Sequence, residues 1–159
     1  MEAVEDFLTP QNVASLLQDL DLVIDCIDEV AAKAALVAHA RSIALRVVIC
    51  GAAGGRKDPA RIRKEDLARA RGDALLAKLR QRLRRDFGFA GPGSGKQPPR
   101  FGVPAIFSDE TAYLPPACDV PGAGPGSPLA CGGYGSSVAV TATMGFAAAA
   151  CALEQIQDR

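Results

Sequence analysis

Short apolar runs alternate with amphipathic segments along the first third of the chain. Residues 22–28 read Leu-Val-Ile-Asp-Cys-Ile-Asp, an apolar run that ends in acid, and residues 45–50 form a second such run. Runs of this kind are typical of strands buried on both faces of a parallel sheet. Residues 30–42 between them are rich in alanine and predict a helix. Strand, helix and strand within about 30 residues predict a βαβ unit.

The pattern predicts further elements on both sides of this unit. A short amphipathic helix is expected over 9–20, where a threonine and a proline precede the first apolar position. Ile62 is expected in a short strand, and 66–87 predicts a basic amphipathic helix. Residues 103–107 predict a strand, and 135–156 a long alanine-rich helix. The apolar face of the 66–87 helix is predicted to consist of Leu75, Leu76, Leu79, Leu83 and Phe87.

Two segments rich in glycine and proline, 88–100 and 115–133, are expected to be mobile loops. The first contains a Gly-Ser-Gly-Lys sequence similar to a phosphate loop. Ala90 stands where that motif needs its first glycine, and Gln97 where it needs Ser or Thr, so no phosphate loop is predicted. Residues 120–153 carry no charge, but they are mostly small, so a core helix is expected rather than a membrane span.

Composition indicates one globular domain. The chain has 159 residues, of which 48% are hydrophobic and 23% charged, as expected for a single packed unit. Aromatic residues make up only 5% and tryptophan is absent, which argues against an aromatic platform for single-stranded nucleic acid. The 18 basic and 18 acidic residues cancel, yet 56–85 holds twelve of the basic residues and four acidic ones. Such a segment indicates either a polyanionic partner or a solvated helix face.

The acidic end of the first apolar run is the first candidate for chemistry. Ligands of open α/β sheets bind beyond the carboxyl ends of the strands, and carboxylate oxygens suit magnesium. Asp28 is therefore a candidate to hold magnesium together with a nucleotide. The alternative for either Asp25 or Asp28 is a helix cap.

Cysteines occur at positions 26, 50, 118, 131 and 151. The odd number, the absence of C-x-x-C pairs and an acidic start without signal character indicate reduced thiols inside a cell, with no zinc cluster. Cys26 and Cys50 are expected to be buried and inert. Cys131 precedes a helix in a glycine-rich loop, where a thiol becomes more acidic; the alternative is a loop cysteine without chemistry. His39 is expected to be structural.

Short motifs throughout the chain match one family in order and approximate spacing. They are residues 23–28, 33–36, 51–55, 58–59, 66–68, 76–80, 86–88, 107–108, Glu110, Cys131 and 140–143. This sequence resembles the tRNA threonylcarbamoyladenosine dehydratases of the ThiF/MoeB/HesA-type group, relatives of ubiquitin-activating enzymes. The resemblance covers only the C-terminal part of the family, since nothing before Asp25 matches the half that bears a G-x-G-x-x-G loop for ATP. At 104–106 the chain has Pro-Ala-Ile where the family often has a cysteine.

The resemblance implies a fold and an activity. Residues 1–159 would form a single partial domain of the α/β class, the C-terminal half of a Rossmann-like adenylating-enzyme fold with a mixed sheet. The implied reaction is ATP-dependent ring closure of threonylcarbamoyladenosine in tRNA, through adenylation of its carboxylate. Asp25, Asp28 and Lys33 would bind ATP, with Asp28 also on magnesium, and Cys131 matches a family cysteine near the active site.

The basic segment then has a polyanion to bind, the phosphates of tRNA. The residues expected to contact it are Arg61, Arg63, Lys78, Arg82 and Arg85.

A partial sheet would expose one edge and an apolar face, so a homodimer or a partner subunit is expected. One alternative is an inactive truncated paralogue or fragment that binds tRNA or a full-length subunit. A second is an activator of a ubiquitin-like or sulfur-carrier protein, a branch that usually carries C-x-x-C zinc pairs. The cytoplasm is the expected location, and an organelle such as the mitochondrion is the alternative if an N-terminal segment is missing.

Overall fold

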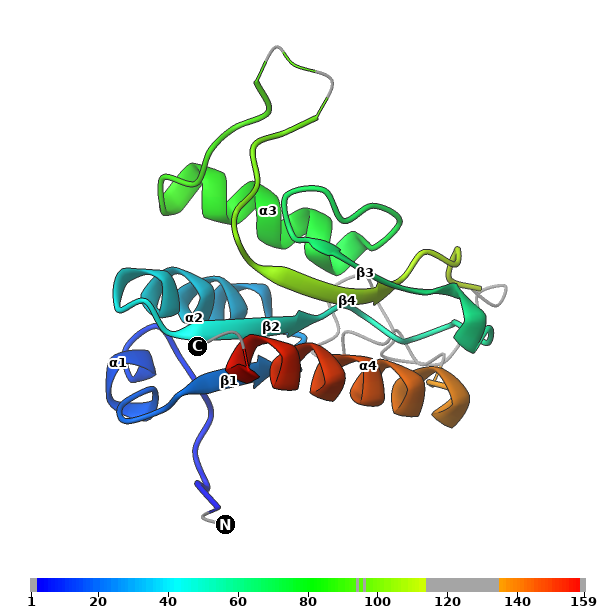
Figure 1. Ribbon diagram of the computed structural model, residues 1–159, viewed down its shortest axis with the longest axis horizontal. Coiled ribbons are helices and arrows are strands. Elements are labelled where there is room, and N and C mark those ends of the chain that lie inside the picture. Colours follow the sequence, from blue (N-terminus) through cyan, green and yellow to red (C-terminus); the bar gives the residue numbers. More distant parts are fainter. Residues whose placement is uncertain (1–2, 94, 96, 114–134, 158–159) are drawn as a thin grey trace, which may run out of the picture.

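The computed structural model describes residues 3–93, 95, 97–113 and 135–157. These residues form a sheet of four strands in the order β1-β2-β4-β3 (Figure 1). Strands β1 (Leu22–Asp25), β2 (Arg46–Cys50) and β4 (Pro104–Ser108) run parallel. Strand β3 (Ile62–Asp66) is antiparallel to β4. The prediction of an α/β fold with a mixed sheet is confirmed.

The βαβ unit follows the sequence pattern closely. Helix α2 (Val30–Ser42) has the predicted limits, and the Glu29 carboxylate caps it by accepting the backbone N–H groups of Ala31 at 2.7 Å and Ala32 at 2.6 Å. The last four residues of β2 are buried, as expected. Strand β1 differs, because it ends at Asp25, lies at the edge of the sheet and leaves Ile24 42% exposed. The prediction that β1 is buried on both faces is therefore wrong.

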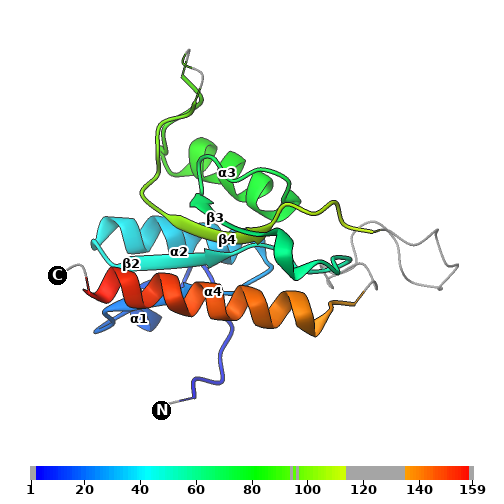
Figure 2. The ribbon, with the colours of Figure 1, turned by 45° about the vertical axis from the view of Figure 1, so that its right-hand side comes forward.

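Helix α3 (Ala74–Asp86) packs beside α2 on one face of the sheet (Figures 1 and 2). It begins at Ala74 rather than at residue 66, because the Asp73 carboxylate caps it by accepting the Leu76 N–H at 2.8 Å. Its buried residues are Leu76, Leu79 and Leu83. Phe87, predicted on this face, is 41% exposed, and the core takes Phe89 in its place.

Helix α4 (Val138–Gln157) covers the opposite face of the sheet (Figure 2). Val140, Met144 and Ala148 on one side of α4 pack against the β2 residue Val48 and the β4 residue Ile106. Within the described residues α4 is the one helix long and apolar enough to cross a membrane by length and composition, which alone is weak evidence. Its packing against the sheet agrees with the expected core helix, although it starts at Val138 rather than at residue 135.

The remaining segments are short or irregular. Helix α1 (Val13–Leu16) is shorter than the predicted 9–20, and the turn before it is closed by Asn12 Oδ1, which accepts the Thr9 N–H at 2.7 Å. A 3-10 turn, η1 (Pro59–Arg61), precedes β3. The described residues between α3 and β4 contain no helix or strand. The mobility of 88–100 stays a prediction, and 115–133 lies outside the described residues.

Candidate functional site

The carboxyl ends of β1, β2 and β4 lie at one edge of the sheet, because these three strands are parallel. Beyond this edge a cavity of about 270 Å³ lies between the two loops after β1 and β2 and the start of α4. Asp28 lines the cavity from the first loop, Gly51 and Gly54 from the second, and Ser136 and Thr141 from the α4 side. Asp28 is exposed to solvent. Asp28 therefore lies beyond the carboxyl ends of the strands, but in the loop after β1, because the strand ends at Asp25.

Asp25 and Lys33 are buried in the protein interior, where Lys33 of α2 meets the end of β1. Lys33 Nζ is 2.8 Å from Asp25 Oδ2, and neither side chain is exposed. Lys33 Nζ also donates to the Ile27 carbonyl at 2.9 Å, while Asp25 Oδ1 accepts the Ile27 N–H at 2.9 Å. Burial raises the pKa of the Asp25 carboxyl, and the Lys33 ammonium acts in the opposite direction. The pair fixes the turn that presents Asp28, and its predicted contact with ATP stays a prediction.

Two cysteines line the same cavity. Cys50 is buried as expected, but Cys26 is exposed, so the prediction that both are buried is wrong. The reason is that β1 ends at Asp25, which leaves Cys26 in the loop. A side-chain hydrogen bond with Cys50 lowers the pKa of the Cys26 thiol to about 7, and the same bond together with burial raises the pKa of Cys50.

Arg56 and Asp73 hold the glycine-rich loop after β2, and sequence reasoning missed both. Asp73 Oδ2 accepts the Ala52 N–H at 2.9 Å and lies 3.3 Å from Arg56 Nη2. Arg56 also donates to the carbonyls of Ala52, Gly72 and Glu110. The only sequence signal was Asp73 before a helical run, typical of an N-cap; nothing local indicated its partner.

Glycine is required at the first position of this loop. A Cβ atom at Gly51 would lie 2.6 Å from Asp73 Oδ2 and 2.8 Å from the Phe107 Cβ. The backbone of the loop therefore passes the Asp73 carboxylate at a distance that only glycine allows.

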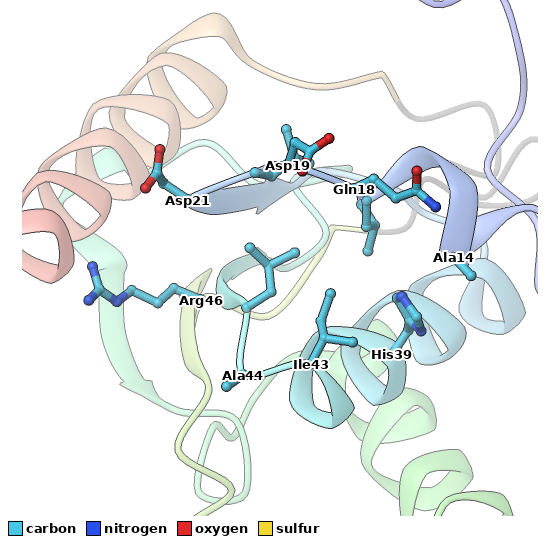
Figure 3. Close-up of a pocket in the computed structure, with 11 residues that line it drawn as sticks. Ala14, Gln18, Asp19, Asp21, His39, Ile43, Ala44 and Arg46 are labelled. Atoms are coloured by element: carbon cyan, nitrogen blue, oxygen red, sulfur yellow. The ribbon is translucent and has the colours of Figure 1, made fainter.

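A larger cavity of about 650 Å³ opens at the other end of β1 and β2 (Figure 3). Asp19 and Gln18 line it on one side, and His39 and Ile43 of the α2 end line it on the other. Arg46 reaches away from it to α4, where its Nη1 donates to the Gln155 carbonyl at 2.7 Å. None of the predicted site residues that the structure describes lines this cavity.

The five basic residues expected to contact tRNA fall into two groups. Arg61 and Arg63, from η1 and β3, both pair with Asp109, at 2.7 and 2.9 Å. The α3 group consists of Lys78, Arg82 and Arg85. In that group Arg82 and Arg85 pair with Asp86, at 3.4 and 2.6 Å. Lys78 is exposed and makes no ion pair with another described residue. Contact with tRNA stays a prediction for all five.

Metal binding at this edge would depend on one carboxylate. No group of three or more His, Cys, Asp or Glu side chains that could hold a metal occurs among the described residues. Magnesium in nucleotide sites is commonly bound through one or two carboxylates together with the phosphates themselves. A single exposed Asp28 fits that donor set. Cys131, the candidate catalytic residue, lies outside the described residues.

Curated relatives match almost the whole length of this chain. No family model matches it. The tRNA threonylcarbamoyladenosine dehydratase of Escherichia coli (strain K12) is 40% identical over 163 residues, covering 98% of this chain and 59% of the relative. The dehydratase of Haemophilus influenzae (strain ATCC 51907 / DSM 11121 / KW20 / Rd) is 34% identical over 156 residues, covering 96% of this chain and 57% of the relative. The chain is homologous to part of a tRNA threonylcarbamoyladenosine dehydratase.

Solved structures agree in fold. The crystal structure of the Escherichia coli dehydratase in complex with ATP matches with a TM-score of 0.79 and 38% identity, over 98% of this chain and 56% of that chain. Another crystal structure of the same enzyme matches with a TM-score of 0.77. The resemblance drawn from the motifs is confirmed. The chain spans less than three-fifths of the length of these curated relatives.

Proposed function

We propose that this chain takes part in the ATP-dependent dehydration of threonylcarbamoyladenosine in tRNA, with Asp28 at the magnesium–ATP site. The observation that carries the proposal is the position of Asp28, which is exposed beyond the carboxyl ends of the parallel strands and lines a cavity there. Nucleotides bind at this edge of open α/β sheets. The Escherichia coli relative has been crystallised with ATP.

The chemistry requires a carboxylate to become an electrophile. Adenylation provides the threonyl carboxylate with a good leaving group, and ring closure then expels AMP. Magnesium would neutralise phosphate charge during adenylation. In this proposal Asp28 holds the metal, while the Asp25–Lys33 pair and the Arg56–Asp73 pair keep the two loops beside the cavity in place.

The tRNA would meet the basic surface of α3 and the η1–β3 segment. Lys78 of α3 has a free ammonium within the described part of the chain, and the arginines there are exposed or half-buried. Phosphate contacts of this kind supply affinity without reading sequence. Both curated relatives are bacterial and are named for tRNA, which favours the cytoplasm as the site of the reaction.

A second candidate is a function that needs a partner subunit or a second copy. Strand β1 lies at the edge of the sheet in the described structure, with Ile24 exposed. On the outer face of α4, Val138 is 78% and Phe146 79% exposed. An unpaired edge and exposed large apolar side chains are typical of surfaces that other chains cover.

Calorimetry with magnesium and ATP separates the two candidates. We expect wild-type chain to bind and the Asp28→Ala variant to lose binding. Asp21→Ala is the matched control, because it removes the same charge at the other end of β1, and it should bind as wild type does. Failure of a folded wild-type chain to bind would contradict the proposal for this polypeptide alone. The same titration would then be repeated with a full-length dehydratase added.

A further inference from the structure

Cys26 and Cys50 lie side by side on the α4 face of the sheet. The parallel register pairs Asp25 with Ile49, and both of these side chains face α2: Asp25 contacts Lys33, and Ile49 belongs to the core beneath α2. Side chains alternate along a strand, so Cys50, the next residue of β2, faces α4. Cys26 directly follows the last residue of β1 and lines the same cavity, beside the α4 residues Thr141 and Met144. Cys50 accordingly packs with the α4 residues.

The two thiols are close enough to react with each other. They line one cavity, and each directly follows one residue of the paired register Asp25↔Ile49. Neighbouring strands lie about 4.7–4.9 Å apart, which falls within the range of about 4.4–6.8 Å between Cα atoms that a disulfide accepts. Cys26 is exposed to solvent and Cys50 is buried, and both are free thiols. One sulfur is therefore open to small oxidants, and the other is positioned to attack the first.

We propose that Cys26 and Cys50 form a reversible dithiol–disulfide site, with hydrogen peroxide or another small peroxide as the oxidant. Cys26 is the residue oxidised first, and Cys50 is the resolving residue. The thiol reaction requires neither ATP nor tRNA, although both cysteines line the same cavity as Asp28.

The reaction balances in two steps. The Cys26 sulfur attacks one peroxide oxygen, so that an S–O bond forms, the O–O bond breaks and one water leaves with the thiol proton. The Cys50 sulfur then attacks the Cys26 sulfur, so that the S–S bond forms, the S–O bond breaks and a second water carries away the Cys50 proton. The two sulfurs lose two electrons, which reduce hydrogen peroxide to water. A dithiol reductant reverses the change by thiol–disulfide exchange.

Mass spectrometry of the whole chain tests the site. Reduced protein is treated with hydrogen peroxide, alkylated and digested without reduction. We expect a Cys26–Cys50 linked peptide, a loss of about 2 Da from the monomer and full recovery with dithiothreitol. N-acetylcysteine in a parallel sample confirms that the peroxide dose oxidises a free thiol. Circular dichroism shows that each variant is folded.

Three variants separate the roles of the cysteines. Cys50→Ser should stop the reaction at a Cys26 sulfenic acid that dimedone labels, and Cys26→Ser should leave Cys50 unoxidised. Cys151→Ser, which removes a buried thiol of α4, should form the disulfide as wild type does. Overoxidation of Cys26 with Cys50 still a thiol, a Cys26 disulfide to another cysteine, or an unreacted Cys26 at the effective dose would each overturn the proposal.

Discussion

The Lys33 ammonium lies 2.8 Å from the Asp25 carboxylate, and neither side chain is exposed. We expect Lys33→Met to destabilise the fold by about 3–5 kcal/mol at neutral pH, because it leaves a buried carboxylate without its cation. The loss should shrink as the pH falls, since a neutral Asp25 no longer needs a partner. Urea unfolding at neutral and acidic pH measures both effects.

The Asp25→Asn/Lys33→Met double variant checks this explanation, because it removes both charges and should lose less stability than Lys33→Met alone. Asp28→Asn should change stability by no more than about 0.5 kcal/mol, since Asp28 is exposed. A double variant less stable than the single one would contradict the pairing.

The close approach at Gly51 predicts a backbone requirement. Gly51→Ala would place a Cβ 2.6 Å from Asp73 Oδ2, and we expect a loss of about 1–3 kcal/mol in chemical unfolding. Gly91→Ala is the matched control, because nothing lies within 4 Å of a Cβ built there. The stability of that variant should be unchanged or higher by up to about 1 kcal/mol, because alanine restricts the unfolded chain. Equal losses for both variants would show that Gly51 has no special packing.

The carboxylate of Glu110 predicts a weakening of the structure in acid. Its Oε2 accepts the backbone N–H groups of Lys57 and Asp58, each at 2.9 Å, and these bonds lower the pKa of Glu110 below its ordinary value of 4.5. The fold therefore favours the ionised form. The stability it contributes is present above pH 4.5 and is lost as the pH falls through the lower folded-state pKa.

Thermal unfolding of Glu110→Gln against pH measures this contribution. The difference in Tm between wild type and the variant should be largest near neutral pH and shrink below about pH 4.5. Glu5→Gln, at an exposed position near the start of the chain, should show a smaller difference throughout. A Glu110→Gln difference that grows in acid would contradict the sign of the shift.

The α3 surface predicts opposite effects of two charge changes on tRNA affinity. Lys78→Ala should weaken binding and reduce the salt slope by about one. Asp86→Ala should strengthen binding, because it releases Arg82 and Arg85 from their ion pairs. Lys64→Ala of β3 is the comparison, and it should weaken binding less than Lys78→Ala does, since Lys64 pairs with Glu154 of α4. Filter binding over a range of salt concentrations provides the data, and an unchanged affinity for Lys78→Ala would exclude α3 as the binding surface.

The elements predicted correctly are those whose own residues carry the signal. The limits of α2 were correct because an alanine-rich run begins after Glu29, whose carboxylate caps the first turn. The prediction of strand β2 was correct because β2 lies between two other strands, and such a strand is apolar on both faces. The position of Asp28 beyond the carboxyl ends of the strands followed from the same parallel arrangement, although β1 itself ends at Asp25.

Elements that depend on distant partners were not predictable. A short strand at Ile62 was expected, but its extent to Asp66 was not, because the charged residues 63–66 form a strand through pairing with β4. The local pattern assigned Asp66 to a helix. Burial of β1 was overestimated because an apolar run does not reveal which strand lies at the edge of the sheet. The Arg56–Asp73 contact joins two loops far apart in the sequence, and the exposure of Cys26 depends on where β1 ends.

The order of strands in the sheet also sets an order of assembly. Strand β4 lies between β2 and β3, although the chain reaches β3 first. During synthesis β3 is therefore made before β4, the strand that pairs with it. It stays unpaired while residues 67–103 are synthesised, which takes seconds at roughly 5–20 residues per second. During this time its exposed Arg63, Lys64 and Glu65 protect the unpaired strand from pairing with other nascent chains. The charges on β3 thus serve the newly made polypeptide as much as the finished sheet.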